Sequence, residues 1–235
     1  MDVPEIHRTQ MSILHELRYA TSKRFSELLE PTEHTSDTFK FHLRKLVKLG
    51  YVEKTTDGMY RLTPSGKEYA NVLDEKRRAP KKQPKLAIML LVSQLVGGEK
   101  QYLLYRRKVN PFYGYWAAMS DAVLWGEAFE EAALKRLQKH AGYEADFAVN
   151  SIVRTRNFTS EGDLPVEDIV FVIMEASNLH GEPHGKYAGG VPEWLSLSQL
   201  LKQDKYFSSL PAILESTVGQ QQVVEIDATY PIGDF

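Results

Sequence analysis

A short basic stretch, KRRAPKKQPK at residues 76–85, divides the chain into two parts with different sequence patterns. It contains six basic residues, two prolines and no acidic residue, which is typical of a linker between folded domains. Apolar residues before it recur at helical spacing, whereas strand-like apolar runs follow it. We therefore expect two domains, residues 1–75 and residues 86–235, joined by a basic linker. Contact with phosphates is an alternative interpretation of the basic run.

The overall composition excludes several classes of protein. With 43% hydrophobic and 26% charged residues, the 235-residue chain resembles an ordinary globular protein. Its longest apolar run, LAIMLLV at 86–92, has the length of a buried strand and is far shorter than the roughly 20 residues that span a bilayer. The absence of cysteine excludes a disulfide framework and a thiolate zinc site. Because the N-terminus is polar and acidic, unlike a secretory signal, we expect a cytoplasmic protein without a membrane partner.

The first part predicts helices followed by a hairpin. Apolar spacing indicates a helix around residues 11–17 and a short one at 25–29. A third helix should start after a cap at Thr35 or Ser36 and end at Gly50. The alternating run at 51–62 contains Asp-Gly, a strong hairpin signal, and the Thr-Pro pair after it begins a fourth helix.

This order resembles an α+β winged helix-turn-helix, and the run TSDTFKFHLRKLVKLGYVEK at 35–54 is similar to the recognition helix of transcription regulators. The resemblance extends over residues 7–73 and implies double-stranded DNA as a partner. If Phe39, Leu43 and Leu46 face the core, the opposite face of the third helix is free for the major groove. The residues predicted to contact DNA are Ser36, Asp37, Lys40, Phe41, Arg44, Lys45, Lys54, Thr55, Thr56 and Arg61. Two alternatives are that Phe41 is a second core aromatic and that the domain contacts only protein.

The second part predicts strands around one central helix. Strands are expected at 85–95 and 101–108, joined by a Gly-Gly turn, and at 168–178. The segment GEAFEEAALKRLQKHAGY at 126–143 predicts a helix, and a strand entering a helix is expected at 191–202. Such an order implies a mixed sheet with helices on both faces.

These elements resemble the Nudix fold, an α/β/α sandwich with a mixed sheet, whose signature is G-x5-E-x7-R-E-U-x-E-E-x-G-U. Glu127, Leu137 and Gly142-Tyr143 match that signature in order. In the family two glycines stand at the start of this signature, and here they are Ser120-Asp121. Two further parts are changed, because R-E is Lys135-Arg136 and E-E is Lys139-His140.

The changed positions decide the expected chemistry. In the Nudix family the carboxylates of this segment bind a divalent metal, typically magnesium, which bridges a diphosphate and helps to activate water. Acids at i, i+3 and i+4 converge from one helical face on a hard cation. Arg136, Lys139 and His140 keep that spacing but would repel Mg²⁺. We therefore predict a degenerate, non-catalytic domain without a metal, a cofactor or a catalytic residue, in which Lys135 still pairs with Glu127.

A basic helix face without metal could instead bind a nucleotide-like or anionic effector directly. Arginines on the second strand and nearby aromatic residues would line the same pocket. The residues predicted to bind this effector are Arg106, Arg107, Tyr113, Tyr115, Glu127, Arg136, Lys139 and His140. The alternative is that the basic residues are merely a solvated face.

The sequence thus predicts a DNA-binding transcription regulator with a ligand-sensing or dimerisation domain, acting as a homodimer. Two alternatives stay open. One is a Nudix hydrolase of a nucleoside diphosphate derivative with a relocated metal site, and the other is a pure protein-interaction module. A relocated metal could use carboxylates of the loop at 160–168 or the His180, Glu182 and His184 group.

Overall fold

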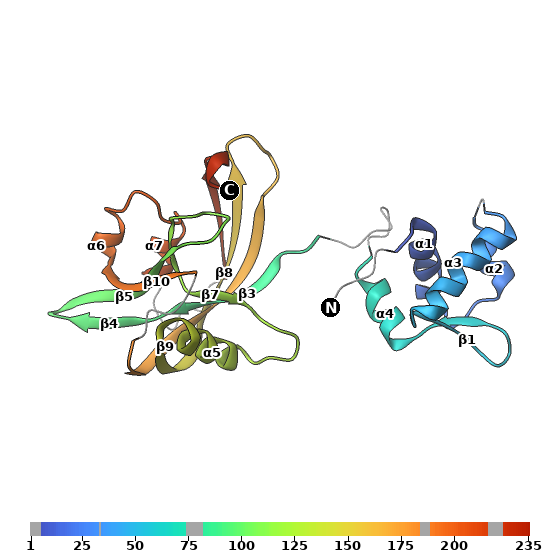
Figure 1. The fold of residues 1–235 in the computed structure, drawn as a ribbon, viewed down its shortest axis with the longest axis horizontal. Helices are drawn as coiled ribbons and strands as arrows, with labels where there is room; N and C mark the ends of the chain where they lie inside the picture. Colours follow the sequence, from blue (N-terminus) through green and yellow to red (C-terminus); the bar gives the residue numbers. More distant parts are fainter. Residues whose placement is uncertain (1–5, 33, 74–81, 184–188, 216–222) are drawn as a thin grey trace. The chain divides into compact units, whose positions relative to one another are not determined.

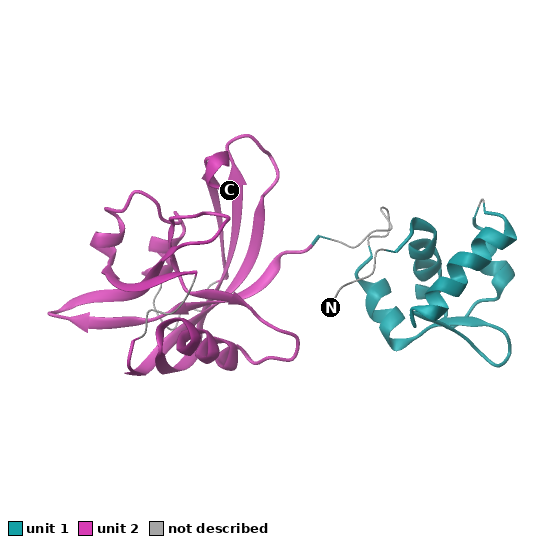
Figure 2. Cartoon of the chain, in the orientation of Figure 1, with its two compact units in different colours: residues 1–82 teal, residues 83–235 magenta. Residues whose placement is uncertain are grey.

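The chain forms two compact units, residues 1–82 and 83–235 (Figure 2). The computed structural model describes residues 6–32, 34–73, 82–183, 189–215 and 223–235. The boundary between the units falls within the expected linker, although residues 76–81 of that linker lie outside the described residues. In the part of the chain that is described, no helix is long and apolar enough to cross a membrane.

The first unit contains four helices and a two-stranded hairpin (Figure 1). In chain order they are α1 (Arg8–Arg18), α2 (Phe25–Leu29), α3 (Ser36–Lys48), β1 (Val52–Lys54), β2 (Tyr60–Leu62) and α4 (Pro64–Asn71). The Thr35 hydroxyl accepts a hydrogen bond from the Thr38 amide and caps α3, as predicted. Before α2, the backbone of Lys23 pairs with that of Tyr60, so the hairpin is anchored to the helical part.

The core of the first unit lies between α1, α3, α4 and the hairpin. Phe39, Leu43 and Leu46 of α3 are buried, as the helical spacing predicts. They pack against Leu14 and Leu17 of α1 in one hydrophobic cluster. One face of α3 is therefore fixed to the core, and the residues on its other face stay exposed.

The second unit contains two sheets. The helices are α5 (Phe129–Ala141), α6 (Leu197–Leu200), α7 (Leu210–Leu214) and the short 3-10 turn η1 (Ile232–Asp234). The strands are β3 (Lys85–Leu91), β4 (Ser93–Val96), β5 (Glu99–Arg107), β6 (Trp116–Ala118), β7 (Ser120–Ala122), β8 (Tyr143–Thr159), β9 (Glu167–Gly181), β10 (Gly190–Ser196) and β11 (Val223–Tyr230). The five-stranded sheet has the order β11-β8-β9-β3-β7, and the other sheet joins β10, β5 and β4, with β6 also paired to β5.

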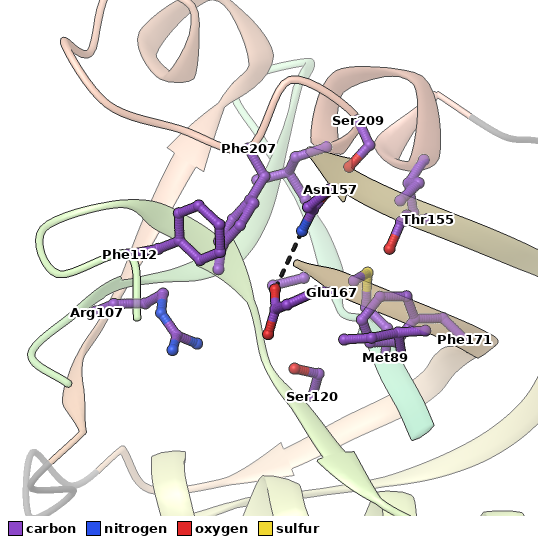
Figure 3. A pocket seen from close by; sticks show the side chains of 15 residues that line it. Met89, Arg107, Phe112, Ser120, Thr155, Asn157, Glu167, Phe171, Phe207 and Ser209 are labelled. Carbon is purple, nitrogen blue, oxygen red and sulfur yellow. Dashed lines mark hydrogen bonds between the residues drawn. The ribbon is translucent and has the colours of Figure 1, made fainter. Parts of the chain in front are cut away.

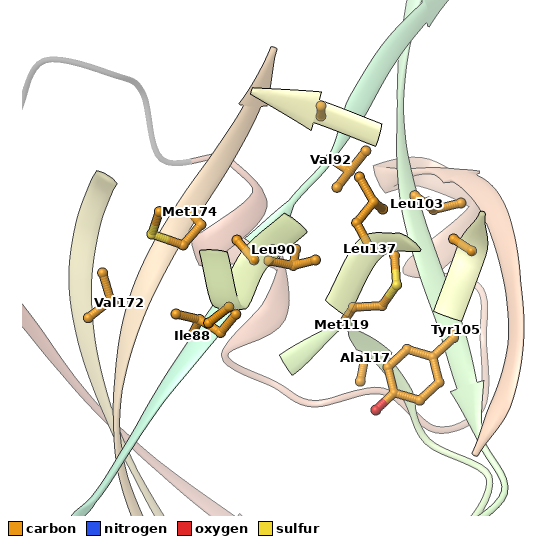
Figure 4. Close-up of a cluster of buried hydrophobic side chains, with 14 residues drawn as sticks. Ile88, Leu90, Val92, Leu103, Tyr105, Ala117, Met119, Leu137, Val172 and Met174 are labelled. Atoms are coloured by element: carbon orange, nitrogen blue, oxygen red, sulfur yellow. The ribbon is translucent and has the colours of Figure 1, made fainter. Parts of the chain in front are cut away.

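The five-stranded sheet is mixed and has helices on both faces, which confirms the predicted α/β/α arrangement. β11 is parallel to β8 and β3 is parallel to β9, whereas β8 with β9 and β3 with β7 are antiparallel. Alternate residues of β3 point to opposite cores. Leu90 packs in the cluster that includes Leu137 of α5 (Figure 4), and Leu91 packs in the cluster that includes residues of α6 and α7.

The strands differ from the sequence-based expectations, most clearly in two places. The predicted strand at 85–95 is two strands, because β3 joins the five-stranded sheet and β4 pairs with β5 in the other sheet. The long strand β8 was not predicted. Its inward positions include the polar residues Thr155 and Asn157, so it lacks the continuous apolar face that reveals a buried strand.

Substitution of Gly66 by alanine should destabilise the first unit. In an exposed helix interior this change stabilises by about 1 kcal/mol. Here the added Cβ of α4 would lie 1.9 Å from the backbone oxygen of Tyr51, so the expected effect is a loss of about 2 kcal/mol. Hydrogen exchange measured by mass spectrometry should become faster in peptides from residues 36–48 and stay unchanged in the second unit. Ser65→Ala in the same helix is the control, and equal exchange in both variants would contradict the clash.

Candidate functional site

Helix α5 lies close to the five-stranded sheet. Its buried residues include Ala132, Ala133 and Ala141, whose small side chains permit a close approach, and Leu137, which fills the core. The helix ends at Gly142, whose φ of 78° is the left-handed conformation that favours glycine. Of the positions that hold acids in the Nudix signature, 136 and 140 are therefore turned toward the sheet, whereas 139 is exposed.

Glu127 is tied to α5 by hydrogen bonds. Lys135 Nζ lies 3.0 Å from Glu127 Oε1, which confirms the predicted pairing of these two residues. Glu127 Oε2 also accepts a hydrogen bond of 3.2 Å from the Leu124 amide. The hydrogen bond from Lys135 holds the pKa of the Glu127 carboxyl below its ordinary value. Glu127 is therefore an ionised carboxylate that fixes the start of the helix.

Arg136 is paired within the chain. Its Nη1 atom lies 2.8 Å from Oδ2 of Asp121, which β7 places beside α5. The Arg136 side chain is only 10% exposed, so its charge is largely withdrawn from solvent. Arg136 stands at a glutamate position of the signature and Asp121 at a glycine position. The two substitutions compensate each other in charge.

His140 is fully buried, which contradicts its predicted place on a basic ligand-binding face. The pKa of His140 is lowered to about 4, mainly by burial and to a smaller extent by the charges of Arg136 and Lys139, whereas Asp121 raises it. His140 is therefore neutral near pH 7. Of the predicted trio Arg136, Lys139 and His140, Lys139 is exposed.

Arg136, Lys139 and His140 do not form a binding site for a divalent cation. A hard cation needs several oxygen ligands, but α5 offers a paired guanidinium, an ammonium group and a buried imidazole at the positions concerned. Within the described ranges, no group of three or more histidines and acidic residues is arranged to hold a metal ion.

Several of the residues considered for a relocated metal site have other partners. Asp168 accepts two hydrogen bonds from Arg154, at 2.9 and 2.8 Å, and Glu167 accepts one of 3.1 Å from Asn157. His180 Nε2 lies 3.6 Å from a carboxylate oxygen of Glu144. His184 lies outside the described residues. Glu161 and Asp163 are exposed in the turn between β8 and β9.

The predicted strand arginines and tyrosines do not form one ligand-binding cluster. Arg106 Nε donates to the Gly114 carbonyl at 3.0 Å, and Arg107 Nη2 donates to the Pro111 carbonyl at 2.9 Å, so both brace the loop after β5. Tyr115 is buried among aromatic rings, and its hydroxyl donates to Asp234 at 2.9 Å, so it is not free to stack on a ligand. Tyr113 is 60% exposed.

A cavity that sequence reasoning missed lies between the five-stranded sheet and the α7 segment (Figure 3). It is lined by Met89, Arg107, Phe112, Ala117, Ala118, Ser120, Thr155, Asn157, Glu167, Ile169, Phe171, Phe207, Ser209, Leu210 and Ile213. Among the predicted ligand residues, Arg107 is the one in this lining. No motif marks the cavity in the sequence, since its polar residues are spread over several strands and the start of α7.

Asn157 and Glu167 provide the polar centre of this cavity. They are directly opposite each other on β8 and β9, and Asn157 Nδ2 donates to Glu167 Oε2 (Figure 3). Asn157 is 4% exposed, and no donor from the described residues hydrogen-bonds its Oδ1 atom. The cavity has a volume of about 90 Å³. Ligand pockets are usually about 300–1,000 Å³, so the cavity in this form is too small for a nucleotide.

Comparison with known proteins gives two family matches. Residues 87–215 match the family described as NUDIX domain, and residues 6–73 match one described as Domain of unknown function (DUF7347). No curated protein matches the chain.

Several solved structures are similar to the second unit. The NUDIX domain of Shewanella oneidensis NrtR, complexed with ADP ribose, has 18% identity and a TM-score of 0.49, covering 66% of this chain and 96% of that chain. A MutT protein from Bacillus halodurans has 18% identity and a TM-score of 0.49, covering 64% and 93%. A MutT NUDIX hydrolase from Burkholderia pseudomallei has 20% identity and a TM-score of 0.46, covering 58% and 100%.

The buried His140 should make the second unit less stable in mild acid. The ordinary pKa of histidine is 6.5, and the folded-state pKa of His140 is about 4. Above pH 6.5 both states are neutral, but as the pH falls toward 4 the unfolded chain binds a proton that the folded chain does not. The free energy of unfolding should therefore fall by roughly 2 kcal/mol between pH 7 and pH 5.

Tryptophan fluorescence in urea is the suitable measurement, because all three tryptophans lie in the second unit. His140→Gln should show a smaller loss between pH 7 and pH 5, and the exposed His180→Gln should behave like the unchanged protein. An equal loss in all three proteins would assign the acid sensitivity to other groups.

Proposed function

Because the chain belongs to the NUDIX domain family, and Arg136, Lys139 and His140 stand where its metal-binding acids are expected, we propose a non-catalytic Nudix domain joined to a DNA-binding unit. In this proposal the protein is a transcription regulator, and its first unit is a winged helix-turn-helix. The order of α1, α2, α3, the hairpin and α4, with Lys23 bridged to Tyr60, supports the winged-helix interpretation.

The observation that carries this proposal is a cationic groove between α3 and the hairpin. Lys40 and Arg44 of α3 and Lys54 of β1 line the groove together with Ser36. The ion pairs formed among the described residues of this unit are Glu16 with Lys23 and Glu53 with Arg61. The three cations of the groove therefore have no carboxylate partner in this part of the chain. Unpaired cations that converge from a helix and a hairpin suit the phosphates and base edges of a duplex.

The exposed face of α3 has the composition that base recognition requires. Ser36, Asp37, Lys40, Phe41, Arg44 and Lys45 are all exposed. An arginine such as Arg44 can donate two hydrogen bonds to the major-groove edge of guanine. Phe41 is 63% exposed, so the alternative that it is a second core aromatic does not hold.

The hairpin residues differ in how free they are to contact DNA. Lys54 and Thr56 are exposed. Thr55 Oγ1 donates to the Met59 carbonyl at 3.0 Å and also bonds Asp57, so its hydroxyl stabilises the turn. Arg61 lies 2.6 Å from Glu53, which reduces the charge it can offer to a phosphate. Lys54 is therefore the hairpin cation best suited to backbone contact.

The role of the Nudix unit in this proposal is regulatory. A homodimer would present two DNA-binding units to the two halves of a symmetric operator. The cavity around Asn157 and Glu167 is the candidate effector site, and its size favours a small group that donates hydrogen bonds over a whole nucleotide. The predicted nucleotide-like effector would need this cavity to open.

DNA binding tests the proposal directly. Arg44→Ala should weaken binding to the preferred duplex by about 1–3 kcal/mol, because one base contact is lost. Lys54→Ala should weaken binding to all sequences about equally and should reduce the dependence of affinity on salt. Fluorescence anisotropy with labelled duplexes at several salt concentrations measures both effects, with Lys67→Ala on α4 as the control. If the intact protein binds no genomic duplex even at low salt, the proposal is wrong.

An assay of hydrolysis tests the proposal that the Nudix domain is non-catalytic. The protein should release no nucleoside monophosphate from ADP-ribose, diadenosine polyphosphates or nucleoside triphosphates in the presence of Mg²⁺ or Mn²⁺. The reason is that positions 136 and 139 hold Arg and Lys, which cannot bind the cation that would activate water and stabilise the leaving group. Chromatographic separation of the products is the measurement. Clear activity that disappears in Glu127→Gln would show that the protein is an enzyme.

A further inference from the structure

Phe41 is an apolar side chain in an otherwise polar part of α3. Its neighbours in sequence, His42 and Leu43, are buried, whereas Phe41 is 63% exposed. Isolated exposed apolar residues are common and need no explanation by themselves. The surroundings of Phe41 are what make it informative.

Two exposed cations lie on the same side of α3 as Phe41, together with one exposed acid, Asp37, four positions before it. Arg44 and Lys45 follow Phe41 by three and four positions, so they are its neighbours on the helix surface. Both are exposed, and neither has a carboxylate partner among the ion pairs of the described residues. The ring of Phe41 meets the ring of His42 edge-on at 5.3 Å between centroids, so the core side of α3 supports its position. A partner that contacts the ring together with these two cations must carry negative charge and must also offer an apolar group.

The major groove of DNA meets both requirements. Its phosphates are anionic, and the C5-methyl group of thymine is an apolar group at a base edge. A phenyl ring has no hydrogen-bonding group, so it can distinguish bases there by contact with that methyl. Arg44, one turn along the helix, can bond a guanine edge near the same position.

We propose that Phe41 is a specificity-determining residue that contacts the C5-methyl group of a thymine in the major groove. This inference rests on the proposed DNA-binding function and adds the kind of base that α3 prefers. A contact with another protein is the competing explanation of the exposed ring, and the test below separates the two.

The test uses deoxyuridine, which differs from thymidine in lacking only the methyl group. The preferred duplex is first selected with the intact protein, and each thymidine is then replaced in turn. For the unchanged protein, replacement should weaken binding at only one or two of the thymidine positions. At each such position the loss should be about fourfold, because burying one carbon group contributes about 0.8 kcal/mol. Phe41→Ala should bind the thymidine duplex more weakly, and its affinity should not change further with deoxyuridine at those positions.

Two variants sharpen the result. Arg44→Ala should keep the deoxyuridine effect while losing affinity, because it removes a different contact. Phe41→Leu keeps an apolar side chain and should retain part of the effect. Since Phe41 is exposed, the alanine variant should fold, and its thermal unfolding monitored by circular dichroism should match that of the unchanged protein.

The outcomes separate this inference from the proposed function. If the unchanged protein binds no duplex, the DNA-binding function fails and the inference fails with it. If it binds a preferred duplex but deoxyuridine has the same effect in Phe41→Ala, DNA binding stands and the role of Phe41 is wrong. Light scattering tests the competing explanation. If the molar mass of Phe41→Ala changes while the deoxyuridine effect stays the same, the ring contacts protein and its proposed role in base recognition is wrong.

Discussion

The close packing of α5 on the five-stranded sheet is the constraint on which the second unit depends. Alanines at 132, 133 and 141 let the helix approach the strands, and Leu137 fills the core between them. The same approach brings Arg136 and His140 to the sheet, where a charge is costly unless it is paired. The chain meets this cost in two ways. Asp121 on β7 neutralises Arg136, and His140 stays uncharged because its pKa is lowered to about 4.

This arrangement changes the interpretation of the basic helix. A row of Arg136, Lys139 and His140 indicates an anion-binding face when charges are counted along the sequence. In the structure one charge is paired, one is absent near neutral pH, and Lys139 remains on the exposed side. At these positions the structure therefore shows an internal ion pair and a buried neutral imidazole, not an exposed anion-binding face. The cavity beside α7 has an amide and a carboxylate at its polar centre, Asn157 and Glu167.

The sequence was informative where local spacing determines structure. The buried face of α3, the cap at Thr35 and the pairing of Glu127 with Lys135 all depend on residues within a few turns of one another. The pairing of Arg136 with Asp121 depends on how β7 lies beside α5, although their opposite charges at changed signature positions were a usable signal. The cavity could not be predicted, because Asn157 and Glu167 meet through the register of β8 and β9. Burial of His140 was missed because a polar side chain does not mark a core position.

Two arginines of the five-stranded sheet differ from the cations of the α3 surface in how they are paired. In the second unit Arg154 and Arg156 each form two hydrogen bonds with one aspartate, Asp168 and Asp227 respectively. A polyanion could recruit these arginines only by breaking such pairs, and each broken pair would leave a carboxylate facing the anion. In the first unit Lys40 and Arg44 require no such exchange, because the ion pairs among its described residues involve other side chains. For equal numbers of contacts, a duplex would therefore gain more from the α3 surface than from the arginines of the sheet.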